Sequence, residues 1–233
     1  MHNFIKILSS LLLLASSTLA DTNTTTPKEK TTTEWVVDGH TLPPEPDPVV
    51  NNATLLGVDV NHNGVRDDVE RWIYKTYNEY FPCHQEHDWN NTVVIRGKTI
   101  PSAIEVCEEN PVPYHPVVRA VSMQGARAAQ IIIQEPEKAR ETREVFAKAY
   151  LCSTVVNDMK DINGRKMYKE YMFGDEFKKI QFNTIQRVRA FGEYNFNLSG
   201  GVYDLPTDDV ILQGCSQEVH ILLEELKTYN VSK

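Results

Sequence analysis

Apolar residues recur at intervals of three and four positions over much of the chain, which is the pattern of helices that bury one face. In the first of these stretches Val69, Ile73 and Tyr77 fall on one side, and Pro82 follows it. Pro136 stands at the start of the third stretch, where a helix tolerates the missing amide N–H. The expected helices cover residues 69–80, 117–132, 136–159, 175–196 and 216–229.

The segment between the first two helices has a different character. Residues 83–113 lack a helical period and contain three prolines, so we expect a loop there with a short strand at residues 92–95. Taken together, the pattern predicts an all-α fold, with a single helical domain of about five helices over residues 51–233.

The first twenty residues predict export. Lys6 precedes an apolar run at residues 7–15, and small residues follow at 16–20, which is the order of a secretory signal peptide. The run is shorter than the roughly 20 residues needed to cross a bilayer, and no later segment reaches that length. We therefore expect a periplasmic or secreted protein with no transmembrane segment.

Residues 21–50 are expected to form a disordered spacer. Seven of the fourteen residues at 21–34 are Thr, and four of the seven at 42–48 are Pro, with little apolar surface to bury. Such a composition is typical of a flexible tail that leads into an extended, proline-rich linker.

The net charge of the chain limits the classes of partner that it is expected to bind. The chain carries 24 basic and 32 acidic residues, and removal of the leader takes only Lys6, which leaves a net charge of −9. Nucleic-acid binding is not expected, because phosphate backbones are held chiefly by Lys and Arg. A basic cluster between Lys160 and Arg189, which includes Arg187, is interpreted as the solvated face of a helix.

All four cysteines follow the predicted leader, in a portion that would reach an oxidising compartment. Four cysteines allow three connectivities, and the sequence alone does not choose among them. The favoured pairs are Cys83 with Cys107, which would close the weakly ordered loop, and Cys152 with Cys215. Both members of the second pair are expected to point into one core.

The segment Asp59–Glu70 has oxygen-bearing side chains at the first, third, fifth, ninth and twelfth of twelve positions. Gly64 is the sixth, where the chain must turn sharply with a positive φ. Calcium takes six to eight hard oxygen ligands, and a carboxylate at position twelve can supply two of them. The predicted ligands are Asp59, Asn61, Asn63, the Val65 carbonyl, Asp67 and Glu70.

This spacing resembles the calcium-binding loop of the EF-hand superfamily, and in particular the single loops of exported bacterial proteins such as dockerin-like modules. The resemblance covers the twelve residues and the helix after them, so it implies Ca²⁺ binding and leaves the rest of the chain open. Residues 51–58 are too short for a regular entering helix, in contrast to the family. The alternative is a polar turn in which Asp67 or Asp68 caps the helix.

A lone loop with two neutral Asn ligands predicts weak binding, in the range of about 10⁻⁴ to 10⁻³ M. Calcium would then serve as a structural staple and not as a signal. The expected function is that of an exported calcium-binding protein with a binding or structural role and an unidentified protein partner. The alternative is a periplasmic or secreted hydrolase with structural calcium.

A second candidate metal site is the pair His84 and His87, three residues apart and followed by Asp88. Two imidazoles beside a carboxylate could begin a transition-metal site, and this is also where an active site would be sought. The alternative is a polar loop beside a disulfide.

Overall fold

A computed structural model describes residues 35–80, 83–158, 174–201 and 208–231. The predicted signal peptide at residues 1–20 and the spacer residues 21–34 lie outside the described residues. Residues 35–50 of the predicted spacer carry regular structure: a short hairpin followed by the start of a helix.

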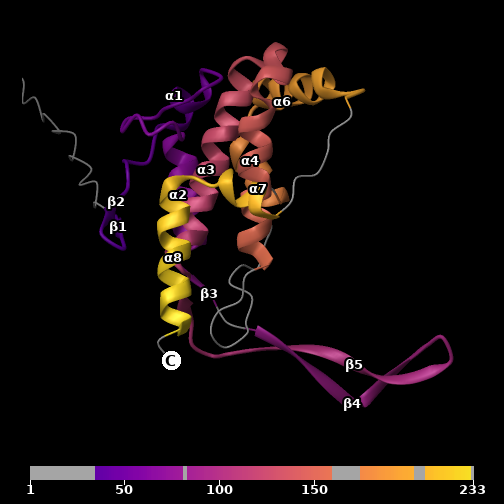
Figure 1. Cartoon of the computed structure of the whole chain (residues 1–233). Helices are drawn as coiled ribbons and strands as arrows, with labels where there is room; N and C mark the ends of the chain where they lie inside the picture. Colours follow the sequence, from indigo (N-terminus) through magenta and orange to yellow (C-terminus); the bar gives the residue numbers. More distant parts are fainter. Residues whose placement is uncertain (1–34, 81–82, 159–173, 202–207, 232–233) are drawn as a thin grey trace, which may run out of the picture. The chain divides into compact units, whose positions relative to one another are not determined.

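The helix α3 is the centre of the core. It contacts α2, α4, α6 and α8 (Figure 1), and small residues such as Gly125 and Ala129 let those neighbours approach closely. Most of its length is buried, and its buried residues include Arg119 and Ser122 as well as apolar side chains. The helices are α1 (Pro48–Asn52), α2 (Asp67–Thr76), α3 (Pro116–Gln134), the 3₁₀ helix η1 (Pro136–Lys138), α4 (Ala139–Asp158), α5 (Asp175–Gln181), α6 (Ile185–Leu198), α7 (Asp208–Gln213) and α8 (Gln217–Val231).

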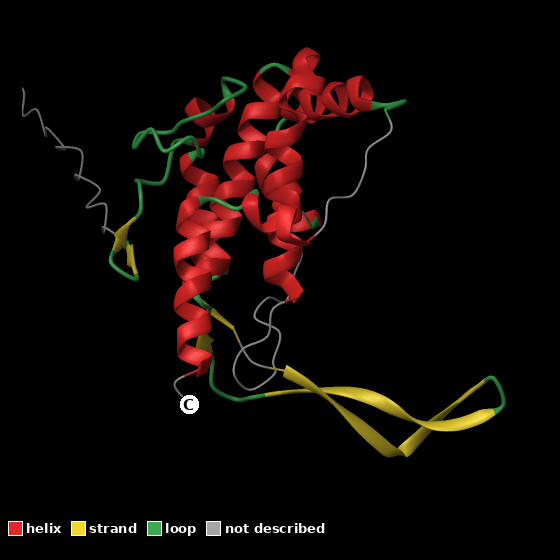
Figure 2. Ribbon diagram, viewed as in Figure 1, coloured by secondary structure: helices red, strands yellow, loops and turns green. Residues whose placement is uncertain are grey.

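The strands form antiparallel pairs, which Figure 2 shows in yellow. The longest pair, β4 with β5, is a twisted two-stranded ribbon whose main contacts are between its own strands. The pairs are β1 (Val36–Val37) with β2 (His40–Thr41), β3 (Glu79–Tyr80) with β6 (Val112–Pro113), and β4 (Cys83–Ile95) with β5 (Lys98–Cys107).

The expectation of an all-α fold is therefore wrong. Helices hold 56% and strands 17% of the structure, which makes the fold α+β. Most of the strand residues come from 83–107, where the sequence predicted a loop with one short strand.

The turn of the long hairpin explains why residues 83–107 pair. Arg96 and Gly97 both have positive φ, at 50° and 75°, as a two-residue type I′ turn requires. Val94 and Ile95 before the turn and Thr99 and Ile100 after it favour extended backbone. The alternation was obscured because three extra residues bulge from β4 between Asp88 and Thr92, whose partners Ser102 and Pro101 are adjacent in β5.

The helix boundaries differ from the expected ones at two places. The helix expected at 69–80 ends at Thr76, and β3 follows it. The helix expected at 175–196 is divided into α5 and α6, because Phe182 leaves the helical region and Thr184 begins a new helix. The Thr184 hydroxyl accepts the Arg187 N–H at 3.3 Å, which is an N-cap.

The predicted bridge between Cys152 and Cys215 is confirmed. It joins α4 to the residues before α8 across 63 positions, with Cα atoms 5.2 Å apart. Closing so long a loop stabilises a protein by about 4 kcal/mol in the chain-entropy model.

The other predicted bridge stays a prediction. Cys83 and Cys107 are partners in the β4–β5 register, and Cys107 is disulfide-bonded. The side chain of Cys83 lies outside the described part of the structure.

Within the described residues, no helix is both long and apolar enough to span a bilayer.

His115 makes the start of α3 sensitive to pH. Its Nδ1 accepts the Val117 N–H at 3.2 Å, and burial lowers the pKa of His115 against the opposing effect of Glu225. The folded protein thus binds this proton less readily than the unfolded chain, whose His has a pKa of about 6.5. The stabilising contribution is complete above that value and is lost as the pH falls through the folded pKa.

We predict that His115→Asn reduces the loss of stability between pH 7.5 and pH 5, since Asn keeps a capping acceptor and does not titrate. Urea unfolding of both proteins at the two pH values measures the difference. Identical pH dependence in the two proteins would contradict the role of His115.

Candidate functional site

The backbone of Asp59–Glu70 has the turn that a calcium loop needs. Gly64 has a φ of 81°, the positive value predicted for the sixth position. The loop ends inside α2, since Asp67 to Glu70 form the first turn of that helix. The twelfth residue is thereby carried on a rigid element.

Asp59 folds back over the middle of the loop. Its Oδ1 accepts the N–H of Asn63 at 3.2 Å, and its Oδ2 accepts the N–H of Gly64 at 2.9 Å. These bonds hold the first position close to the fifth and sixth.

Glu70 faces the predicted ligands from α2 although its side chain is fully buried. Its Oε2 accepts from the Nδ2 atoms of Asn61 at 3.0 Å and Asn63 at 2.8 Å. Its Oε1 lies 2.7 Å from His40 Nε2 of the β1–β2 hairpin. Positions three, five and twelve thus converge, as the loop hypothesis requires.

Asp67 and Val65 lie at the edge of this group. The Asp67 carboxylate accepts the Val60 N–H at 3.1 Å, and the Val65 N–H donates to Asn63 Oδ1 at 2.8 Å. Burial, together with the negative charges of Asp59, Glu70 and Asp68, raises the pKa of Asp67 to about 6 against the lowering effect of the Val60 hydrogen bond. Negative charge is therefore concentrated around the loop.

The structure brings together some of the predicted ligands and not others. Asn61, Asn63 and Glu70 are in direct contact, and Asp59 joins them through the backbone of Asn63. Among the residues that the structure describes, no three His, Cys, Asp or Glu side chains form a metal-binding group. Only three of the six predicted ligands have side chains of these types, namely Asp59, Asp67 and Glu70.

Arginines attach this loop to the helices. Arg66 is 1% exposed, and its guanidinium donates to the carbonyls of Ile180 at 2.6 Å and Gln181 at 3.0 Å, at the end of α5. It also pairs with Asp68 at 2.5 Å. Arg127 of α3 donates to the Asn63 carbonyl at 2.9 Å.

Arg187 holds the segment before the loop. It is fully buried and donates to the carbonyls of Asn51 at 2.6 Å, Thr54 at 3.1 Å and Leu55 at 2.9 Å. Its interpretation as part of a solvated face is therefore wrong. No signal in the sequence pointed to this role, because the acceptors are backbone atoms more than 130 positions away.

The side chains of Arg66 and Arg187 both pack against the backbone of Gly57. Its φ is 71°, and a Cβ there would lie 2.2 Å from Arg66 Cδ and 2.8 Å from Arg187 Nη2. Only glycine satisfies both constraints.

The histidine hypothesis gains no support. Residues 84 and 87 belong to β4, and positions three apart along a strand occupy opposite faces. The His87 ring lies against Trp89, with centroids 6.3 Å apart. The side chain of His84 lies outside the described residues.

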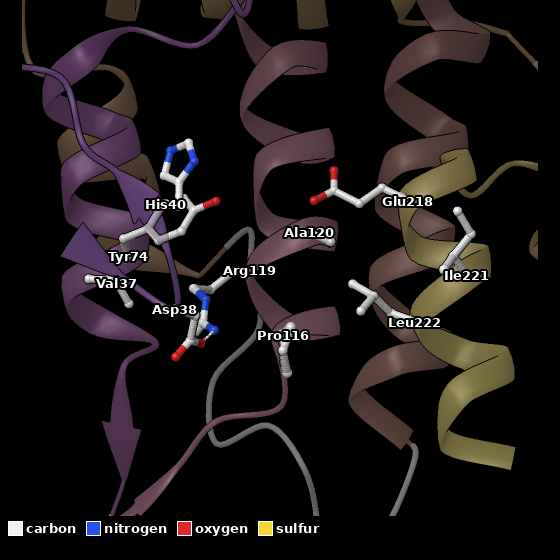
Figure 3. Close-up of a pocket in the computed structure, with 10 residues that line it drawn as sticks. All are labelled: Val37, Asp38, His40, Tyr74, Pro116, Arg119, Ala120, Glu218, Ile221 and Leu222. Carbon is white, nitrogen blue, oxygen red and sulfur yellow. Dashed lines mark hydrogen bonds and ion pairs between the residues drawn. The ribbon is translucent and has the colours of Figure 1, made fainter. Parts of the chain in front are cut away.

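A pocket of about 340 Å³ adjoins the loop between β1–β2, α2, α3 and α8. Figure 3 shows His40 beside Tyr74, on which it stacks at 4.5 Å, and Asp38 paired with Arg119. Because His40 also contacts Glu70, one side chain belongs to both sites. With Glu218 these residues form the polar part of the lining. The apolar part is Val37, Pro116, Ala120, Ile221 and Leu222.

Comparison with protein-family models, with curated proteins and with solved structures finds no match for this chain.

We predict that Gly57→Ala destabilises the protein by more than about 3 kcal/mol, because the backbone strain adds to an overlap with two buried side chains. Gly39→Ala is the matched control, since Gly39 has a φ of 77° and nothing within 4 Å of its Cβ position. It should cost about 1 to 2 kcal/mol, the strain alone. Chemical denaturation measures both, and equal losses would contradict the proposed packing.

Proposed function

We propose that this is an exported protein that binds one calcium ion in the loop Asp59–Glu70, with the ion as a structural staple. Its role is binding or structural. The proposal rests above all on Glu70, a fully buried carboxylate that faces the side chains of Asn61 and Asn63. A buried carboxylate needs hydrogen-bond partners, and here they are the Asn61 and Asn63 amides and the His40 ring.

The donor set suits a hard cation. An Asn side chain offers an amide oxygen as well as the nitrogen that now contacts Glu70. Together with Asp59, the Val65 carbonyl and Asp67, it makes an all-oxygen set of the kind that calcium prefers. A carboxylate that can bind through both oxygens favours calcium over the smaller magnesium ion.

The expected stabilisation is modest. For a dissociation constant of about 10⁻⁴ to 10⁻³ M and calcium near about 1 mM, binding to the folded state contributes about 0.4 to 1.4 kcal/mol. That amount can order a loop but cannot fold a domain. The arginine contacts of Arg66, Arg127 and Arg187 are consistent with this division, because they attach the segment to the helices without an ion.

The compartment supports the same role. The leader at residues 1–20 predicts passage to the periplasm or the medium, where calcium is more abundant than in the cytoplasm and a weak site can fill. The predicted exposure to an oxidising compartment agrees with the bridge between Cys152 and Cys215.

The alternative is a hydrolase with structural calcium, and the pocket beside His40 is where its site would be sought. Its ten described lining residues include two carboxylates and a His, but Asp38 is paired with Arg119 and His40 contacts Glu70 and stacks on Tyr74. Burial raises the pKa of Tyr74 to about 12, so this phenol is a poor base at neutral pH. The pocket therefore favours a binding role.

Calorimetric calcium titration of the mature protein tests the proposal. Wild type should bind one ion with a dissociation constant of about 10⁻⁴ to 10⁻³ M, and Asp59→Ala and Glu70→Gln should each weaken binding at least about tenfold, since each removes a charged ligand. Melting in calcium and in chelator should differ for wild type and coincide for Glu70→Gln.

The matched control is Glu193→Gln, the same change at an exposed position of α6. It should bind and melt like wild type under both conditions. Unchanged calcium binding in both loop variants would contradict the assignment, and melting of wild type that is indifferent to chelator would contradict the staple role.

A further inference from the structure

The β4–β5 hairpin presents apolar side chains that its own strands do not cover. Positions that pair across antiparallel strands share a face, so the register groups Val93, Ile95, Ile100 and Ile104 on one side of the ribbon. Their side chains are 44%, 54%, 39% and 44% exposed. A two-stranded hairpin with such a face is marginally stable in water by itself.

Charge is separated along the same ribbon. Arg96 and Lys98 lie at the turn, and no acidic residue occurs from Thr92 to Ser102. Glu86 and Asp88 lie toward the other end, and register places both on the apolar face with Lys98. The face thus has a cationic end and an anionic end.

The edges of the ribbon are poorly suited to the addition of another strand. Pro101 has no N–H to donate from β5, and the bulge between Asp88 and Thr92 interrupts β4. An extended peptide would lose pairing on either side. The face, and not the edge, is the surface available to a partner.

A lipid surface does not fit this face either. Anionic headgroups attract Arg96 and Lys98 but repel Glu86 and Asp88 on the same side. A second ribbon of the same sequence, laid antiparallel, fits both ends, because the cationic end of each copy then lies over the anionic end of the other. It also covers the apolar residues of both copies.

We propose that this hairpin face is a self-association surface, on which two copies of the chain stack their β4–β5 ribbons in antiparallel orientation about a twofold axis. The arrangement is isologous, as in most homodimers.

Sedimentation equilibrium of the mature chain between about 1 and 100 µM tests this proposal, over the range where transient interfaces form. Wild type should dimerise within that range, and Ile100→Glu should weaken association at least about tenfold by placing an unpaired charge in the interface. Ile185→Glu is the matched control, because Ile185 is 64% exposed on α6. It should associate like wild type.

Charge reversal tests the orientation in the same experiment. Lys98→Glu and Glu86→Lys should each weaken dimerisation by roughly threefold to fivefold, and the combined variant should recover it. Circular dichroism confirms that each variant folds. A wild-type monomer at the highest concentration, a dimer unaffected by Ile100→Glu, or no recovery in the combined variant would overturn the proposal. So would a monomer that floats with anionic phospholipid vesicles through this hairpin.

Discussion

The irregular segment between α1 and α2 lies against helices, and its backbone carbonyls need donors there. Buried carbonyls without partners are costly, and this segment forms no sheet or long helix to satisfy them. The donors come instead from side chains: Arg187 takes three carbonyls, and Gln130 and Arg127 take those of Leu56 and Asn63. Arg66 makes the reciprocal contact from the segment to the end of α5. These side-chain contacts to backbone carbonyls hold the loop Asp59–Glu70 in position against the helices.

The same contacts limit where a calcium ion could stabilise the loop. Arg66 and Arg187 lie close enough that burial and their mutual repulsion lower the pKa of Arg187 to about 10, while Asp68 offsets part of the charge. The carboxylate of Glu70 is served by neutral amides and by His40. An ion would act inside the loop, where negative charge is concentrated, and not at the junction with the helices. Because His40 contacts Glu70 and also lines the pocket, an ion bound to Glu70 would also affect the pocket.

Local patterns were predictable, and distant polar contacts were not. The three-to-four spacing located α3, α4 and α8, and the inward positions of Cys152 and Cys215 identified their bridge. The spacing of the candidate ligands in Asp59–Glu70 is also a local pattern, and calcium binding by them stays a prediction. Arg187 was wrongly expected on a solvated face, because its acceptors are carbonyls more than 130 positions away and their placement depends on the complete fold. The β4–β5 hairpin was missed because a bulge and Pro101 break the alternation that marks a strand.

Anomalous diffraction from a crystal of the mature protein grown in calcium shows where the proposed ion lies. We expect one peak within about 2.3 to 2.6 Å of both Glu70 carboxylate oxygens and of oxygens from Asp59, Asn61 and Asn63. We also expect the contacts of Arg66 and Arg187 to be the same with and without calcium. A loop without a peak at saturating calcium, or a peak elsewhere in the chain, would contradict the proposed calcium site.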